Sequence, residues 1–209
     1  MEPLIIPAII ATSQSELDET LNRLRGKAER VQLDVMDGIF VPTRSLDWDI
    51  EIPRGFTYEV HVMSINPIRV LRGLAGRTHI ALLHYESIEY PDQAILELKS
   101  LGFKVYIAVA PDTSITSIEP YLDQLDGVLV MTVTPGRYGA PFIPKTLDKV
   151  RRIRKLRNDL PIEVDGAMNP MNVKAAWDAG ANEFVSGSFV LKAVDPSQAI
   201  QQLKMAIYM

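Results

Sequence analysis

Two aspartates lie inside apolar runs of the chain, Asp34 in the stretch QLDVM and Asp165 in the stretch IEVDG. An unpaired carboxylate is costly to bury, so each of them calls for a functional partner. Two carboxylates on different sides of one ligand suit the inversion of a carbon next to a carbonyl. One removes a proton from one face, and the other returns a proton to the opposite face. The sequence therefore predicts that Asp34 and Asp165 form an acid–base pair.

A nitrogen ligand for a metal follows the next apolar run. Inversion of this kind passes through an enediolate, whose oxygens need positive charge nearby, and a divalent metal can supply it. His61, in the run YEVHVM, offers the imidazole that would help to hold such an ion. Other polar residues close similar runs, namely Asp37, His84, Glu86, Asp112, Thr134 and Ser188. Taken singly, each of these is equally well explained as a cap or a loop residue.

These side chains can meet only if the apolar runs are strands of one sheet. The candidate strands are short, rich in β-branched residues and nearly continuous in apolar character, as in sheets buried on both faces: 4–10, 30–36, 58–63, 79–85, 104–110, 127–133, 161–166 and 183–188. Amphipathic segments lie between them and predict helices at about 14–25, 67–75, 91–101, 115–125, 145–157, 170–179 and 196–207. The sequence therefore predicts an α/β protein.

Eight strands that alternate with helices are what a parallel (β/α)₈ TIM barrel requires. We expect a single barrel domain over residues 1–209, in which the segment after strand two is shortened and poorly helical. A doubly wound open sheet is the alternative, but it needs a glycine-rich turn after the first strand, and ATSQSE offers none. In a barrel the C-terminal strand ends form the active-site face, and this is where Asp34, His61 and Asp165 fall.

The composition excludes several classes of protein. A net charge of -4 argues against binding to nucleic acid or to an anionic membrane. There is no cysteine, which excludes disulfides, zinc–thiolate sites and thiol nucleophiles. No apolar stretch approaches the ~20 residues of a membrane span, and the first residues lack the basic segment of a signal peptide. We expect a cytoplasmic protein that binds a small molecule.

Three glycine-containing loops follow the last strands: TPGRYGAPF, DGAMNP and SGS. Such loops at helix starts offer backbone N–H groups and a favourable dipole to an anion, and barrels often bind phosphate near strands seven and eight. Glycine as a simple turn residue is the alternative explanation for each loop. Three such loops on one face favour a phosphate site.

Four stretches resemble the successive signatures of the ribulose-phosphate 3-epimerase family: LDVMDGIFVP, VHVMSINP, VLVMTVTPGRYGAPFIPKTLDKVRRIR and IEVDGAMNPMNVKAAWDAGANEFVSGS. The resemblance runs in order along essentially the whole chain. It implies an isomerase of carbohydrate metabolism that inverts C3 of D-ribulose 5-phosphate to give D-xylulose 5-phosphate, a step of the pentose phosphate type. Asp34 would then be the proton acceptor and Asp165 the proton donor, and both would ligate a divalent metal with His61.

The resemblance also implies a set of substrate-binding positions: Ala8, Met36, His61, Met63, Met131, Gly136, Arg137, Tyr138, Gly139, Gly166, Ala167, Gly187 and Ser188. The methionines would form a polarisable floor beneath the substrate, although gap-filling in the core is the simpler explanation. We expect a homo-oligomer, with a phosphosugar as ligand and with neither nucleic acid nor membrane as partner.

The chain departs from the family pattern at several of these positions. Gln32 replaces a histidine two residues before the first aspartate, and Ala8 replaces a serine. Ala167 replaces a second glycine, and the pair Arg137-Tyr138 replaces a glycine and an aromatic residue. The metal set would then be Gln32, Asp34, His61 and Asp165. Because a neutral amide is a weaker ligand than an imidazole, we expect the metal (Zn, Mn, Fe or Mg) to be weakly held, and the oxygen-rich set suits Mn or Mg better than Zn. These departures fit an epimerase of another ketose phosphate, a weakened metal site, or a barrel that binds phosphosugars without turnover.

Overall fold

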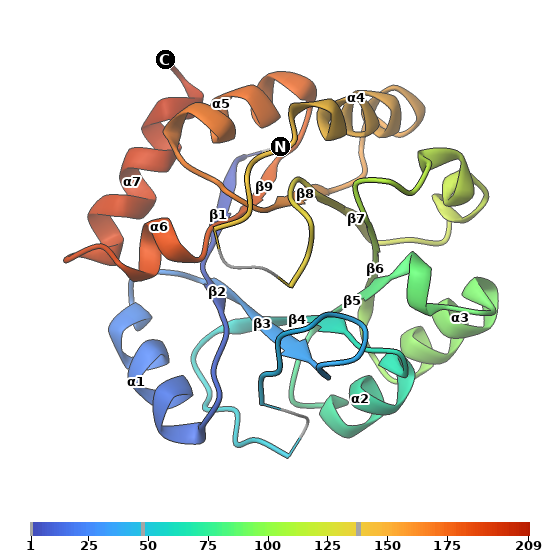
Figure 1. Cartoon of the computed structure of the whole chain (residues 1–209), viewed down its shortest axis with the longest axis horizontal. Helices are drawn as coiled ribbons and strands as arrows, with labels where there is room; N and C mark the ends of the chain where they lie inside the picture. Colours follow the sequence, from blue (N-terminus) through green and yellow to red (C-terminus); the bar gives the residue numbers. More distant parts are fainter. Residues whose placement is uncertain (1, 47–48, 137–138) are drawn as a thin grey trace.

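The structure, a computed structural model, describes residues 2–46, 49–136 and 139–209. Its strands form one parallel sheet in the order β1-β9-β8-β7-β6-β5-β4-β3-β2. The strands are β1 (Leu4–Ile6), β2 (Ala8–Ile9), β3 (Arg30–Met36), β4 (Thr57–Met63), β5 (Ile80–His84), β6 (Lys104–Val109), β7 (Gly127–Met131), β8 (Ile162–Asp165) and β9 (Glu183–Val185). Figure 1 looks down this sheet as it curls into a barrel, with the helices outside it.

The first predicted strand is present in two halves that close the barrel. β1 pairs with β9, whereas β2 pairs with β3, and Pro7 stands between the two halves. A proline has no N–H to give to a ladder, so it suits the point where the chain passes from one neighbour to the other. The two halves count as one strand of the barrel, and the predicted (β/α)₈ fold is confirmed.

The helices surround the strands: α1 (Gln14–Leu24), α2 (Pro67–Leu74), α3 (Pro91–Ser100), α4 (Leu147–Leu156), α5 (Pro170–Ala179), α6 (Ser188–Leu191) and α7 (Pro196–Ile207). Their starts have local causes. The Ser13 side chain accepts a hydrogen bond from the N–H of Glu16 and caps α1. A proline is at the first position of α2, α3, α5 and α7, where its missing N–H costs little.

One predicted element is wrong, and another ends earlier than predicted. The helix expected at 115–125 is instead a pair of 3₁₀ turns, η2 (Ile115–Ser117) and η3 (Glu119–Tyr121). Ser114 caps the first turn, and Pro120 would remove an N–H from any longer α-helix. The last predicted strand also ends early, because residue 188 begins α6. The segment after β3 has no helix in its described residues 37–46 and 49–56, as expected.

The alternation of side chains along each strand produces two different interiors. Outward-facing residues such as Val60 and Val164 pack against the helices in one large apolar core. Inside the barrel, Leu82, Ala108 and Leu129 form a smaller cluster. The barrel interior is not wholly apolar, because Gln32, Asp34, Glu59, His61, Glu163 and Glu183 are also buried. These polar groups must find partners across the barrel.

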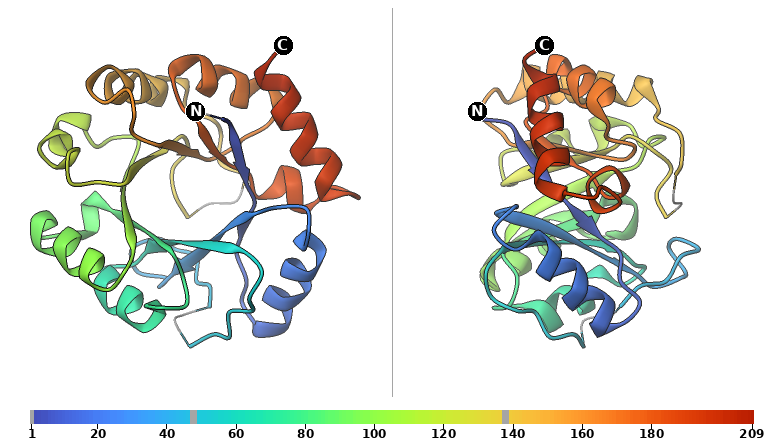
Figure 2. Two further views of the ribbon diagram at one scale, coloured as in Figure 1. Left: turned by 180° about the vertical axis from the view of Figure 1, so that it is seen from behind. Right: turned by 90° about the vertical axis from the view of Figure 1, so that its left-hand side faces the viewer.

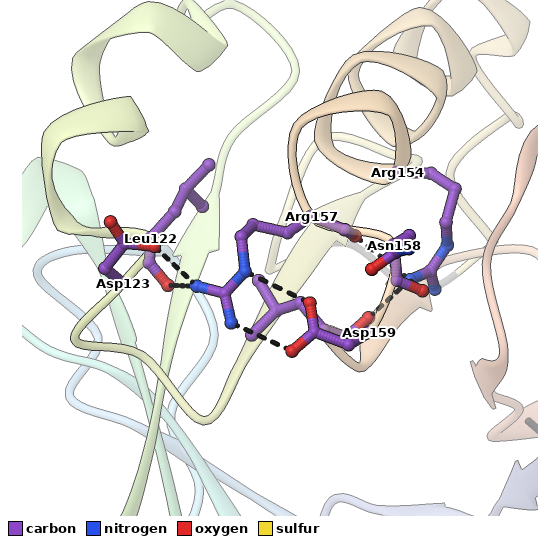
Figure 3. A network of polar contacts seen from close by, with 7 residues as sticks. Leu122, Asp123, Arg154, Arg157, Asn158 and Asp159 are labelled. Carbon is purple, nitrogen blue, oxygen red and sulfur yellow. Dashed lines mark hydrogen bonds and ion pairs between the residues drawn. The ribbon is translucent and has the colours of Figure 1, made fainter.

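Arginines at the end of α4 hold the loops of the opposite, N-terminal face. Arg157 donates to the carbonyl of Leu122 and to the carboxylates of Asp123 and Asp159 (Figure 3). Arg154 donates to the carbonyl of Asn158 in the loop that leads to β8. Contacts at this face of a barrel serve stability, whereas active sites lie at the other face.

The loops after β3 and β7 project from the C-terminal face, as the side view of Figure 2 shows in blue and yellow. They are joined there, because the Thr43 hydroxyl donates to the carbonyl of Gly136 at 2.7 Å. Two distant segments of sequence therefore cover the same mouth of the barrel.

In the part of the chain that the structure describes, no helix has the length and apolar character needed to cross a membrane.

Candidate active site

A cavity of about 490 Å³ opens at the C-terminal strand ends. It is lined by most of the positions selected from the sequence: Ala8, Asp34, Met36, His61, Met63, Met131, Gly136, Gly139, Asp165, Gly166, Ala167, Gly187 and Ser188. Gln32 is fully buried beneath them and does not line the cavity. Arg137 and Tyr138 lie outside the described residues. The fold thus brings together side chains that lie far apart in the chain, from Ala8 to Ser188.

Asp34, His61 and Asp165 meet at the base of this cavity. Asp34 and His61 are direct partners in the register of β3 and β4, and Asp165 ends β8 on another side of the barrel. The Nδ1 atom of His61 lies 3.3 Å from Asp34 Oδ1 and 3.4 Å from Asp165 Oδ2. One imidazole nitrogen therefore faces both carboxylates.

Gln32 joins the same group from below. Its Nε2 donates to Asp34 Oδ1 at 2.8 Å and to Asp165 Oδ2 at 3.0 Å. Its Oε1 is buried and has no hydrogen-bond partner among the described residues. The sequence led us to expect this oxygen to face the centre, but here the nitrogen does, because two carboxylates need donors. Rotation of the amide by half a turn would exchange the two atoms.

Burial and charge act in opposite directions on this group. Burial raises the pKa of Asp34, although hydrogen bonds from His61 and Gln32 work against the shift. Burial alone would lower the pKa of His61, but its hydrogen bonds to Asp165 and Asp34 raise that pKa to about 9. These contacts favour a proton on Nδ1 of His61, so a cation that binds this nitrogen displaces that proton.

The donor set fits a divalent cation. One ligand atom from each of Asp34, His61 and Asp165 lies within 4.8 Å of the others. A rotated Gln32 amide would add the oxygen that now lacks a partner. Carboxylate and amide oxygens with one imidazole suit Mn²⁺, Mg²⁺, Fe²⁺ or Zn²⁺. The four residues could therefore hold such an ion.

The walls of the cavity differ in character. Met36, Met63 and Met131 line its floor and are almost wholly buried. At its rim, Gly136 packs so closely on Val41 that a Cβ would lie 2.4 Å from that side chain. Ala167, after β8, has a left-handed backbone (φ 53°), which an alanine adopts only with strain. This is the position where the family pattern has a second glycine.

Several polar residues of the site escaped the sequence-based selection. Thr43, Asn169 and Lys192 also line the cavity. The signal for Lys192 was its place one helical turn after Ser188. Thr43 carried no such signal, because its loop has no regular period.

Two further residues, His84 and Glu86, were noted at a strand end but not selected. His84 Nε2 lies 2.9 Å from His61 Nε2, and His84 Nδ1 lies 3.2 Å from Glu86 Oε2. Burial lowers the pKa of His84. Burial would raise the pKa of Glu86, but hydrogen bonds from His84, Thr113 and Ala110 lower it to about 2. A row of contacts therefore runs from His61 through His84 to the carboxylate of Glu86, whose low pKa favours its ionised form.

Asp37, in contrast, is a loop cap. Its carboxylate accepts hydrogen bonds from the backbone N–H groups of Ile39, Phe40 and Ile65. It fixes the loops after β3 and β4 next to each other, and it does not line the cavity.

The fold and this cavity define a (β/α)₈ barrel with two carboxylates and an imidazole at its C-terminal mouth. Within that class the chain belongs to the ribulose-phosphate 3-epimerase family, whose model matches residues 4–191. Ribulose-phosphate 3-epimerase of Schizosaccharomyces pombe is 34% identical over 97% of this chain and 93% of its own length. The enzyme of the same name from Bacillus subtilis is 32% identical over 96% and 97%.

Solved structures of other barrels share the fold. 3-Hexulose-6-phosphate synthase from Salmonella typhimurium superposes with a TM-score of 0.70 over 98% of both chains, at 12% identity. Orotidine 5'-phosphate decarboxylase from Pyrococcus horikoshii gives a TM-score of 0.68 over 99% of this chain and 100% of its own, at 14% identity. At such low identity these likenesses show the architecture alone.

Proposed function

We propose that this chain interconverts D-ribulose 5-phosphate and D-xylulose 5-phosphate by proton transfer at C3. The observation that carries the proposal is the placement of Asp34 and Asp165 on different strands, on either side of His61, at the base of one cavity. The names of the relatives in the family support the same reaction.

Each carboxylate serves one face of the substrate. In one direction Asp34 removes the proton from C3, and Asp165 delivers a proton to the opposite face; in the reverse direction the roles exchange. Burial raises the pKa of Asp34 and so makes it a stronger base than a carboxylate in water. The methionine floor keeps water away from the reacting carbon without offering a competing proton donor.

Asp34, His61, Asp165 and a rotated Gln32 amide are the residues that would hold the divalent cation. When bound, such a cation supplies the positive charge that stabilises the enediolate oxygens. Before it binds, the Gln32 amide and His61 hold the two carboxylates in place through the hydrogen bonds described above.

The phosphate would lie at the other end of the cavity, against the loops after β8 and β9. Gly166, Ala167, Gly187 and Ser188 line this end, and Lys192 brings a cationic side chain to it. Ala8 lines the cavity as well and has no hydroxyl to offer to the substrate. Single-domain organisation and assembly into a homo-oligomer stay predictions.

Solvent-deuterium incorporation at C3 of ribulose 5-phosphate, followed by NMR, tests the proposal. It reports proton abstraction even when net turnover is slow. We expect exchange with loss of the C3 proton signal. Calorimetric binding of ribulose 5-phosphate without any exchange would overturn the proposal in favour of a non-catalytic phosphosugar-binding barrel. Exchange seen only with a different ketose phosphate would instead change the substrate.

A further inference from the structure

A row of three side chains runs from Glu86, which is partly exposed at the rim of the barrel, through the buried His84 and His61 to the candidate metal centre. We propose that Glu86, acting through His84, is a positioning residue that keeps a proton on Nε2 of His61 and so dedicates its Nδ1 to the centre between Asp34 and Asp165. The contacts of the row are the 3.2 Å approach of Glu86 Oε2 to His84 Nδ1 and the 2.9 Å approach of the two Nε2 atoms.

The direction of these hydrogen bonds starts from Glu86. Its Oε1 accepts from the N–H of Ala110 at 3.0 Å and from the hydroxyl of Thr113. Its Oε2 faces His84. An ionised carboxylate can only accept hydrogen bonds, so the proton between Glu86 and His84 must be on Nδ1 of His84.

The next hydrogen bond in the row joins His84 to His61. This side chain is fully buried, with the ring of Phe40 tilted against it at a centroid distance of 5.0 Å. Only one proton fits between the two Nε2 atoms, which lie 2.9 Å apart. When Nδ1 of His61 holds a cation, the remaining proton of that imidazole is on Nε2, so His61 donates and Nε2 of His84 accepts. The rings of His61 and His84 lie 5.0 Å apart and 24° from parallel, which keeps the two nitrogens together.

The consequence concerns the other nitrogen of His61. With Nε2–H engaged by His84, Nδ1 is the atom left to face the two aspartates. A partner on the far nitrogen of a metal-binding histidine fixes its tautomer and raises its basicity. Here that partner is a second histidine, and the anion behind it is Glu86. The inference builds on the proposed metal-assisted epimerase, but it can be tested without substrate.

The first measurement is the tautomer of each histidine by long-range ¹H–¹⁵N NMR of the unmodified protein. The chain has three histidines, so each signal can be assigned by single replacement. We expect a proton on Nδ1 and a bare Nε2 in His84, and a proton on Nε2 in His61. His79 is an internal reference for the opposite tautomer, because its Nδ1 accepts the N–H of Tyr58 at 3.1 Å. A proton on Nε2 of His84 with a bare Nε2 in His61 would overturn the proposal.

The second measurement compares variants of Glu86. In Glu86→Gln the amide oxygen stays with Ala110 and Thr113, so the NH₂ group faces Nδ1 of His84 and removes its acceptor. We expect the His84 proton to move to Nε2 and the Kd for Mn²⁺, measured by electron paramagnetic resonance, to rise roughly 10- to 100-fold. Glu86→Asp keeps a carboxylate and should recover part of the affinity.

Glu89→Gln, three residues away at an exposed position, is the matched control and should leave both readouts unchanged. If Glu86→Gln binds Mn²⁺ as Glu89→Gln does, with unchanged tautomers, Glu86 does not position His61. If Glu86→Gln fails to fold, the tautomers of the unmodified protein still decide. Neither readout needs substrate, so an absence of epimerisation would contradict the proposed function and leave this inference standing.

Discussion

The two ends of the barrel interior both contain buried carboxylates, but they satisfy them in different ways. At the C-terminal end, Asp34 and Asp165 share the Gln32 amide and His61, and they border an open cavity. Hydrogen-bond donors face both carboxylates, and the cavity lets a metal cation reach them from the solvent. Charge at this end is available for chemistry.

At the N-terminal end, one arginine pairs with two glutamates, and a third glutamate is buried without a hydrogen-bond partner in the described residues. Arg30 Nη1 lies 3.4 Å from Glu59 Oε2 and 3.0 Å from Glu183 Oε2. Both carboxylate oxygens of Glu163 are buried and lack a hydrogen-bond partner within the described parts of the chain. Burial raises the pKa of Glu59 to about 8 and the pKa of Glu163 well above its usual value. Burial thus favours the protonated, neutral form of the glutamates at this end, whereas hydrogen-bond donors face the aspartates at the other end. Among the described residues of the barrel interior, carboxylates are therefore open to a ligand only at the end where the cavity reaches them.

The largest expected effect comes from removing either of the two carboxylates that we propose as the acid–base pair. Asp34→Asn and Asp165→Asn should each lower epimerisation by ~10²–10⁴-fold or more, because each serves one face of the substrate. Deuterium exchange from the two separate epimers should be lost unequally in the two variants. Asp37→Asn, in a capping loop, should cost far less. Near-normal exchange in both variants would show that the two-carboxylate mechanism is wrong.

Gln32 tests the C-terminal end of the barrel through its affinity for a metal ion. An amide holds a cation more weakly than an imidazole does, and this amide must also rotate to present its oxygen. We expect sub-stoichiometric metal after dialysis and a several-fold higher occupancy in Gln32→His, measured by elemental analysis. The Asp165→Asn variant should lose metal in the same assay. Full and tightly held zinc in the unmodified protein would contradict this prediction.

Glu163 tests the other end through the pH dependence of stability. Since the folded pKa of Glu59 is about 8 and that of Glu163 is also raised, the native state holds more protons than the unfolded chain. Stability should therefore fall as the pH rises from the usual glutamate range towards 8. Glu163→Gln should weaken that fall and add roughly 1 kcal/mol at pH 8. Urea unfolding at pH 5 and pH 8 measures the free energy of unfolding, with Glu89→Gln as control. The same fall in stability between the two pH values in Glu163→Gln and in the unmodified protein would contradict the prediction.

Ala167 gives the smallest effect. Its left-handed backbone costs about 1–2 kcal/mol for a residue with a Cβ, and a glycine avoids that cost but loses more entropy on folding. Ala167→Gly should therefore stabilise the protein by about 1 kcal/mol at most. Ala193→Gly, in a loop without positive φ, should destabilise it. Equal destabilisation by both changes, seen in urea unfolding, would show that Ala167 carries no strain.

Much of the fold follows from local pattern. The strand predicted at 30–36 and the helices predicted at 170–179 and 196–207 have the observed bounds. The helix predicted at 115–125 failed because Ser114 and Pro120 favour short turns, and apolar spacing does not register such competition. The cavity positions were predicted from the family resemblance and from polar residues at strand ends. The second signal works because the C-terminal ends of parallel strands lie at one edge of the sheet.

The sequence by itself determined which runs are strands, that they alternate with helices, and which carboxylates lie at strand ends. Periodicity and residue type are local properties, so they can be read without coordinates. Only the tertiary structure decided the partners of each polar group: the Gln32 nitrogen on two aspartates, His84 behind His61, and Glu59 and Glu183 on Arg30. These pairings depend on distances across the barrel between residues far apart in the chain, and hydrogen-bond direction follows from such distances.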